Sequence, residues 1–311
     1  MNIIYLIPKS SYISNYDSDF LFGYILTILN YFYGVDYTND IIKKFENNEP
    51  PFLMSSTFYF TKIDNKKTLY FPKPQIHSEF RDINNIADYA ELKSIKKQKY
   101  INYENLLELI SSSNFNVEML NNLSIQNINI KETSTPHSRI NRITNSTAQE
   151  SFYHIDEIFI KDGGLFFLYE GDLKIIEPAL NFINHHGLGA DASTGKGNFK
   201  IEISEISIPQ VENPNYFINL SSYYPTMEEV EFFKNNPQNL FYEIVQKQGK
   251  IGVNSYATKL FKKKLVSYFS PGSVFPIIPN RNYYGTIKEV SSIYDTSIKF
   301  NGYSLNIKIR L

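Results

Sequence analysis

A glycine-rich segment in the middle of the chain constrains the fold more than any other stretch. Glycine has no Cβ, so it accepts positive φ angles and lets a ligand approach the backbone closely. Consecutive N–H groups in such a turn can bind an anion, and a lysine adds a point charge. The segment contains Gly187, Gly189, Ser193, Thr194, Gly195, Lys196 and Gly197. This composition predicts a phosphate-binding loop, and a glycine-rich connection with only a structural role is the alternative.

The expected elements on either side of this loop argue against the P-loop of nucleotide hydrolases. In a P-loop, four residues separate the first glycine from the Gly-Lys pair, a Ser or Thr for magnesium follows, and a helix begins there. Here five residues lie between Gly189 and Gly195, and a glycine follows the lysine. Residues 178–184 read as a helix with Pro178 in its first turn, and alternation from residue 199 predicts a strand. We therefore expect a loop that joins a helix to a strand and does not hydrolyse ATP.

Several short segments, spread in order over almost the whole chain, resemble the motifs of one protein family. They are residues 18–23 (SDFLFG), 50–56 (PPFLMSS), 70–74 (YFPKP), 137–144 (HSRINRIT) and 270–275 (SPGSVF). Together with the Gly-Lys-Gly loop between a helix and a strand, this ordered set resembles the RAMP superfamily of CRISPR effector proteins. Within that superfamily it is most similar to subunit four of the type III-A (Csm) complex. In the fourth segment Asn141 stands where the family has aspartate.

The order of the predicted elements indicates an α+β fold. The first half reads as strands near 2–8, 52–60, 151–160, 164–170 and 198–208, with helices at 18–33 and before Gly187. This is close to the βαββαβ order of a ferredoxin-like or RRM-like domain. We expect two such domains in tandem: residues 1–208, with an insertion at about 62–150 and the glycine-rich loop (G-loop) at 187–197, and residues 209–311. The resemblance implies that part of the insertion is a thumb-like β-hairpin lying against guide RNA.

The resemblance also implies a function, which is the non-catalytic binding of CRISPR RNA (crRNA) in antiviral defence. Such a subunit caps the 5′ repeat-derived tag of the guide and docks onto the large polymerase-like subunit, beside the backbone RAMP subunits. The expected RNA-binding residues are the seven named above for the G-loop, together with Ser18, Lys73, His137, Arg139 and Arg142. Loop N–H groups and Lys196 would hold backbone phosphates, and aromatic side chains would hold unstacked bases.

Two alternatives belong to other functional classes. Some RAMP relatives cut CRISPR precursor RNA by general acid–base catalysis, and His137 is the best candidate for that chemistry here. The second alternative is a protein-docking module whose G-loop contacts a neighbouring protein. No residue near His137 stands out as a partner base, and the histidines lack the spacing of metal ligands. We therefore expect no enzymatic activity, no metal and no other cofactor.

Composition limits the possible partners and the compartment. Lys and Arg number 31 against 32 Asp and Glu, so RNA binding must depend on local patches, such as the lysines within 93–99 and 259–264. Cysteine is absent, which excludes disulfides and agrees with a reducing cytoplasm. The apolar run 20–33 is shorter than the roughly 20 residues of a membrane helix, and residues 1–5 read as a strand and not as a secretion signal. A cytoplasmic protein without membrane contact is expected.

Overall fold

The computed structural model describes residues 1–64, 66–76, 98–111, 128, 130–237, 240–249, 262–291 and 297–311, with only the backbone given for 148–150. Its main sheet has the strand order β5-β4-β3-β8-β1-β9, and β2 also pairs with β8. The strands are β1 (Asn2–Pro8), β2 (Phe52–Met54), β3 (Phe58–Ile63), β4 (Lys66–Pro72), β5 (Tyr100–Asn102), β8 (Gly163–Gly171) and β9 (Phe199–Glu205). Their pairings are antiparallel, and the predicted α+β class is confirmed.

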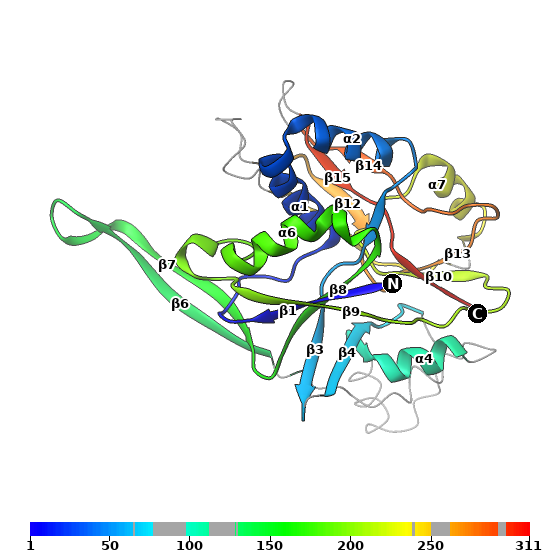
Figure 1. The fold of residues 1–311 in the computed structure, drawn as a ribbon, viewed down its shortest axis with the longest axis horizontal. Coiled ribbons are helices and arrows are strands. Elements are labelled where there is room, and N and C mark those ends of the chain that lie inside the picture. The colour runs from blue at the N-terminus through cyan, green and yellow to red at the C-terminus, as the bar shows by residue number, and fades with distance from the viewer. Residues whose placement is uncertain are drawn as a thin grey trace.

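The helices α1 (Ser18–Tyr33) and α6 (Leu173–His186) connect strands of this sheet and pack against each other (Figure 1). Helix α1 follows β1, and α6 links β8 to β9, so the central order β9-β1-β8-β3 is that of a βαββαβ unit. The shorter α2 (Val35–Glu46) follows α1 and packs against it. Helix α6 begins earlier than predicted because Asp172 caps it by accepting a hydrogen bond from Lys174 N–H. Pro178 therefore lies inside the helix and not in its first turn.

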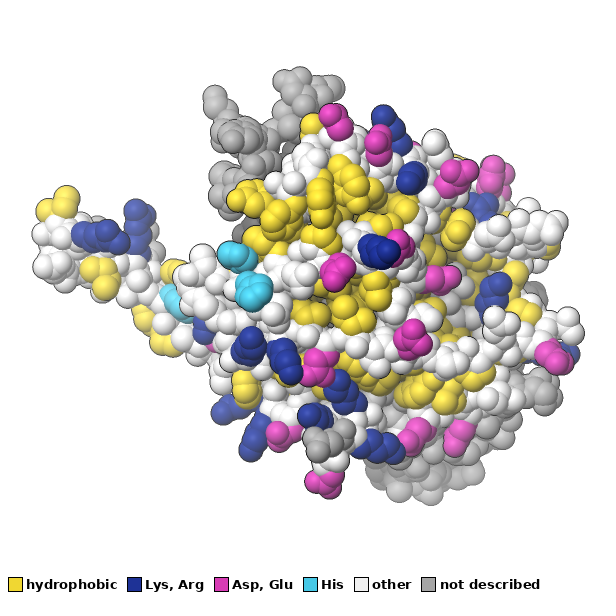
Figure 2. Space-filling model, in the orientation of Figure 1, with side chains coloured by type: hydrophobic (Ala, Val, Ile, Leu, Met, Phe, Trp, Pro, Cys, Tyr) yellow, Lys and Arg dark blue, Asp and Glu magenta, His cyan; other side chains and the backbone are white. Residues whose placement is uncertain are grey.

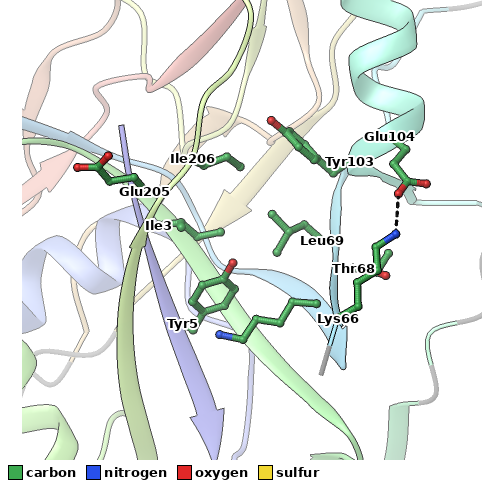
Figure 3. A pocket seen from close by; sticks show the side chains of 10 residues that line it. Ile3, Tyr5, Lys66, Thr68, Leu69, Tyr103, Glu104, Glu205 and Ile206 are labelled. Carbon is green, nitrogen blue, oxygen red and sulfur yellow. Dashed lines mark hydrogen bonds and ion pairs between the residues drawn. The ribbon is translucent and has the colours of Figure 1, made fainter. Parts of the chain in front are cut away.

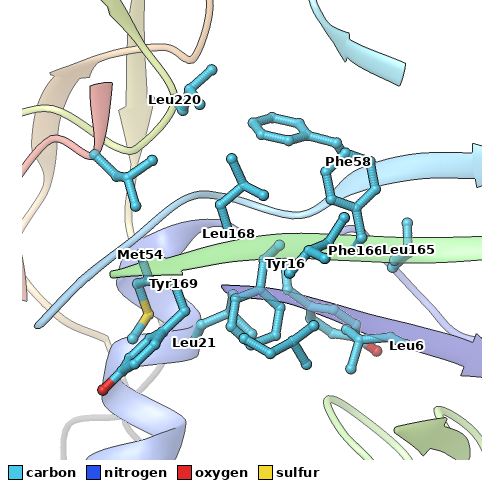
Figure 4. Close-up of a cluster of buried hydrophobic side chains, with 14 of the residues drawn as sticks. Leu6, Tyr16, Leu21, Met54, Phe58, Leu165, Phe166, Leu168, Tyr169 and Leu220 are labelled. Carbon is cyan, nitrogen blue, oxygen red and sulfur yellow. The ribbon is translucent and has the colours of Figure 1, made fainter. Parts of the chain in front are cut away.

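Both faces of the main sheet are covered, which explains the uninterrupted apolar sequences of its central strands. Side chains of β8 alternate between the two faces, and Figure 4 shows Leu168 on the side of Leu220 and Tyr169 on the other side. Leu220 lies in the second half of the chain, while Leu21 of α1 packs on the helix side. All four side chains are at most 1% exposed.

A long two-stranded hairpin projects from this body (Figure 1). Its strands β6 (Ile130–Asn141) and β7 (Ser146–Ile160) pair from Ile130↔Ile160 to the tip, with an irregularity between Ser138 and Ile140. Its strand β7 contains the predicted strand 151–160, and the role of the hairpin as a thumb lying against guide RNA stays a prediction. Within the described part of the expected insertion, β4 and β5 extend the edge of the main sheet, and α4 (Tyr103–Ser111) packs beside them.

The second half forms smaller sheets and one described helix. Its elements are β10 (Tyr216–Asn219), α7 (Met227–Lys234), β11 (Ile244–Lys247), β12 (Val266–Phe269), β13 (Val274–Pro276), β14 (Ile287–Glu289), β15 (Lys299–Asn301) and β16 (Asn306–Ile309). Strands β13-β10-β16 form one sheet, and β11-β12 and β14-β15 form two pairs. Helix α7 is capped at Thr226, since Thr226 and Glu229 form a capping box. The tandem ferredoxin-like arrangement and the boundary at residue 208 stay predictions.

One hydrophobic cluster spans both halves, and two smaller clusters lie within the second half. Ile218, Val274, Ile307 and Ile309 of the β13-β10-β16 sheet belong to the same buried cluster as the main sheet. Among the described residues, no helix combines the length and the apolar character that spanning a membrane requires.

Candidate nucleic-acid interface

The G-loop begins where α6 ends and leads into β9, which confirms the predicted order of helix, loop and strand. Gly187 is the C-cap of α6, with φ +81°, and its N–H donates to Ile183 O at 2.9 Å. A single turn of 3-10 helix, η1 (Ala192–Thr194), follows within the loop. Gly189, Gly195 and Gly197 also have positive φ angles.

Packing within the loop explains most of its glycines. A Cβ on Gly197 would lie 2.1 Å from Leu188 O, and one on Gly189 would lie 2.8 Å from a ring carbon of Tyr16. A Cβ on Gly187 would lie 2.9 Å from Gly197 O. Gly195 differs, because a Cβ there would meet no atom within 4 Å and only its φ of +90° favours glycine. Close backbone contacts therefore shape the loop, whatever it binds.

The backbone N–H groups of the loop fall into two sets. Those of Leu188 and residues 194–196 donate to carbonyl oxygens within the loop, and that of Gly197 donates to Ser11 O. Among the described residues, the N–H groups of 189–193 have no acceptor. Ser193, the last residue of this second set, is exposed. Residues 189–193 are thus the part of the loop that can donate to a bound anion.

Lys196 does not have the free ammonium group that the sequence analysis predicted. Its Nζ lies 2.6 Å from Oε2 of Glu157 on β7 and 3.2 Å from Oγ of Ser11. Hydrogen bonds from Lys196 and Ser11 hold the pKa of the Glu157 carboxyl below its ordinary value. The positive charge of Lys196, which was expected to bind an RNA phosphate, is therefore paired with a carboxylate of the chain itself. Through this ion pair Lys196 joins the loop to the hairpin.

Ser18 lies in the interior, and the predicted RNA contact finds no support in that position. Its side chain is 1% exposed, and its Oγ accepts a hydrogen bond from Ser222 N–H at 2.8 Å. The cap of α1 is Asp17, whose side chain accepts from Phe20 N–H, and Ser18 is the first residue of the helix. The next residue, Asp19, accepts from Asn301 N–H. This motif therefore joins α1 to the second half of the chain.

Lys73 is half-buried, and burial lowers the pKa of its ammonium group. Its backbone N–H donates to Lys99 O at 2.9 Å. A Cβ on Gly272 would lie 2.7 Å from Lys73 O, so the YFPKP and SPGSVF segments pack against each other. This contact leaves no room for a Cβ at Gly272, and the φ of +93° at this residue independently favours glycine.

The structure brings His137, Arg139 and Arg142 together on the projecting hairpin. The His137 ring stacks on Tyr153, the residue directly opposite on β7, with ring centroids 5.5 Å apart. Both arginines are exposed, Arg142 in the turn at the tip, and Figure 2 shows basic side chains there. Phe152 and Tyr153 are also exposed. Among the described residues no group of His, Asp and Glu is arranged to hold a metal ion.

Sequence reasoning missed four residues of this region: Ser11, Glu157, Phe152 and Tyr153. The pairing of Tyr153 with His137 could not be inferred from a turn at 142–145, because a regular hairpin would then place Glu150 opposite His137, and the irregularity between Ser138 and Ile140 shifts the register by three residues. No local signal marks Glu157, because a glutamate in an alternating strand normally faces solvent. The lysines at 93, 96, 97 and 259 lie outside the described residues.

A pocket of about 260 Å³ lies between β1, β4, β9 and α4 (Figure 3). Its lysines already have partners: Lys66 pairs with Glu104 at 3.2 Å, and Lys67 pairs with Glu202 at 2.8 Å and lies over the Tyr5 ring. Hydrogen bonds from Lys67 and Lys200 lower the pKa of Glu202 to about 2. These paired charges offer no cation for a phosphate, so the G-loop and the hairpin are the better candidates for an RNA interface.

Comparison with known proteins gives matches to a family model, to a curated relative and to solved structures. Residues 212–309 match the model of the CRISPR Csm4 C-terminal domain. A curated relative, the CRISPR system protein Csm4 of Thermococcus onnurineus (strain NA1), is 25% identical over 235 residues, which cover 72% of this chain and 75% of the relative. Csm4 in a crystal structure of a Csm1–Csm4 cassette in complex with pppApA has a TM-score of 0.66 at 20% identity, over 100% of this chain and 98% of that one. The resemblance to Csm4 is confirmed.

A second solved structure is similar over the whole fold. It is the Csm3–Csm4 subcomplex of the type III-A CRISPR-Cas interference complex, with a TM-score of 0.62 and 18% identity over 98% of each chain. At these identities the solved structures establish the fold alone.

Proposed function

We propose that this chain is a non-catalytic crRNA-binding subunit of a type III-A CRISPR effector complex. It binds the 5′ repeat-derived tag of the guide RNA and docks onto the large polymerase-like subunit and a backbone RAMP subunit. Solved Csm4 relatives occur with Csm1 and with Csm3, which supports both contacts. The observation that carries the proposal is the joining of a G-loop with unpaired N–H groups to a projecting hairpin with exposed arginines and aromatic rings.

In this proposal the loop and the hairpin contact different parts of one RNA strand. The N–H groups of 189–193 and the Ser193 hydroxyl donate to backbone phosphates, which positions the strand without reading its sequence. Arg139 and Arg142 add charge contacts along the hairpin. The exposed rings of Phe152 and Tyr153 stack on unpaired bases, as aromatic side chains do in single-strand RNA recognition.

Docking to other subunits has a candidate surface at the end of α1 and the start of α2. Its exposed residues are Tyr31, Phe32, Tyr33, Val35 and Tyr37, with Tyr31 80% exposed. Figure 2 shows hydrophobic side chains gathered over the face that α1 and α6 form. Aromatic side chains are enriched in protein interfaces, and patches of this kind mark interaction sites. We assign this patch to contact with a neighbouring subunit of the complex, in the cytoplasm.

The proposal excludes catalysis by His137. Its ring stacks on Tyr153, and its Nε2 has no hydrogen-bond partner among the described residues. General acid–base cleavage needs a second group within hydrogen-bond reach of the reacting atoms. The His137–Tyr153 pair is better suited to stacking than to proton transfer.

The test is guide retention by the reconstituted complex with Ser193→Asp in this chain. Aspartate places a negative charge beside the N–H groups of 189–193, and Ser193→Asn is the neutral control of the same shape. We expect the aspartate variant to lose guide RNA about tenfold more readily at low salt, with a difference from the parent that shrinks as salt screens the repulsion, and the asparagine variant to retain it. Equal retention by both variants would show that the loop does not bind RNA.

The same complexes separate the alternatives. If the loop variant keeps its RNA but loses a protein subunit, the G-loop is a docking element. Metal-independent cutting of repeat RNA by the isolated chain, abolished by His137→Ala, would establish the nuclease.

A further inference from the structure

The hairpin and the G-loop are held together through the short segment that follows β1. Ser11 Oγ donates to Glu157 Oε2 at 2.6 Å, and Ser11 O accepts from Gly197 N–H at 2.8 Å. Tyr12 and Ile158 exchange two backbone hydrogen bonds, of 3.0 and 2.7 Å. The Lys196–Glu157 ion pair completes this junction. Two residues of the loop, two of the segment and two of β7 thus form a single connected network.

Glu157 marks the point where the hairpin leaves the body. Its side chain is 4% exposed, and among the described side chains of β6 and β7 it is the last buried one toward the tip. Beyond it the hairpin is a two-stranded ribbon, which has little stability of its own. The direction of the ribbon is therefore controlled at this junction.

The junction and the stacked rings lie on one face of the hairpin. The cross-strand pairs Thr133↔Glu157, Thr135↔Ile155 and His137↔Tyr153 follow at intervals of two residues, so their side chains point to the same side. Glu157 and Tyr153 are four residues apart, or about 13 Å along the strand. The face that Lys196 holds against the loop is the face that carries the His137–Tyr153 stack.

We propose that Glu157 and Lys196 are positioning residues that fix the hairpin at a set distance and direction from the G-loop. This inference rests on the proposed function: the phosphate contacts of 189–193 and the base contacts of the hairpin then act on one RNA strand in a fixed register. Lys196 acts through Glu157 and not by contacting RNA. Removing the Lys196 side chain weakens guide binding because the hairpin can then change its direction relative to the G-loop.

The absence of cysteine from the sequence makes a direct measurement practical. Spin labels on Thr144→Cys at the hairpin tip and Asn181→Cys on α6 report the distance between hairpin and body in the full chain. We expect one narrow distance distribution for the parent protein and broad ones for Glu157→Gln and Lys196→Met. The charge exchange Glu157→Lys with Lys196→Glu should narrow the distribution again. Lys67→Met, which breaks a pair of similar length elsewhere, is the control and should change nothing.

Guide binding by the assembled complex, measured with the same variants, separates the two proposals. We expect the single variants to bind crRNA about tenfold more weakly and the charge exchange to recover most of the loss. Unchanged distance distributions in the single variants would overturn the positioning role, whatever happens to RNA binding. Broadened distance distributions with unchanged RNA binding would show that the ion pair fixes the direction of the hairpin, and would refute the RNA function of the hairpin. Should either single variant fail to fold, Ser11→Ala removes one donor to Glu157 and should broaden the distribution to a smaller extent.

Discussion

The G-loop and the hairpin tip are both exposed turns, yet they are held in opposite ways. The loop is fixed by close contacts, with Gly197 and Gly189 pressed against Leu188 O and the Tyr16 ring. The tip has few such contacts, and Ile143 within it is 94% exposed. Substitutions in the loop should therefore act first on folding, and substitutions on the hairpin should act on binding while folding is preserved.

Because close contacts hold the G-loop, substitution of Gly197 should cause the largest loss of stability. In Gly197→Ala the new Cβ would lie 2.1 Å from Leu188 O at a φ of +61°, so the loop must rearrange. We expect the free energy of unfolding to fall by about 3 kcal/mol, as for other strained or overpacked sites. Gly195→Ala has open space around it and should cost only about 1 kcal/mol of backbone strain. Equal losses in urea unfolding would show that packing does not shape the loop.

The same packing makes Gly189→Asp unsuitable as a probe of RNA contact. Its Cβ would meet the Tyr16 ring, so lost binding could come from a damaged loop. Ser193 is exposed and avoids this problem.

At the junction of the two regions, Glu157→Gln should have the next largest effect. It leaves a partly buried Lys196 without its carboxylate, which we expect to cost about 2–3 kcal/mol, less than for a fully buried pair. Because the folded-state pKa of Glu157 is lowered from 4.5, its stabilising contribution is complete above that pH and is lost as the pH falls through the folded value. Unfolding of both proteins between pH 7 and pH 3 should therefore show a difference that shrinks on acidification. A difference that grows toward low pH would contradict this sign.

On the hairpin, Tyr153→Ala should change binding more than folding. The ring is 53% exposed, so its loss should cost under about 1 kcal/mol of stability. Stacking on a base contributes roughly 1–3 kcal/mol, so crRNA affinity of the complex should fall about tenfold. Tyr153→Phe keeps the ring and should bind like the parent. A loss of stability without a loss of crRNA affinity would show that the Tyr153 ring contributes to folding and not to binding.

The smallest expected change in folding is for Arg139→Gln combined with Arg142→Gln. Both side chains are exposed, so unfolding should shift by no more than about 0.5 kcal/mol. Each phosphate contact on single-stranded RNA contributes about 0.7 to the slope of log affinity against log salt, so the slope should decrease by about 1.4. The double Arg→Lys variant keeps the charges and the slope. An unchanged slope in the Gln variant would remove the arginines from the interface.

Local sequence was sufficient for the helix–loop–strand order around the G-loop and for β1, β8 and β9 of the main sheet, whereas the predicted strand 52–60 is divided into β2 and β3. Gly187 ends α6 because a positive φ favours glycine there, and alternation after residue 198 marks β9. The start of α6 was misplaced, because Asp172 caps the helix ahead of Pro178. These features depend on neighbours within one or two turns, which pattern and capping rules describe well.

Tertiary structure alone decided what the site residues contact. Lys196 pairs with a residue 39 positions away, and the hydroxyl of Ser18 accepts from one 204 positions away. In the sequence, a lysine in a glycine-rich loop and a serine at the start of a helix both look available for ligand binding. Composition carries no information on which distant carboxylate or backbone group will fold against them. The glycine positions were thus readable from local backbone geometry, while the partners of the charged and polar side chains followed from packing across the whole chain.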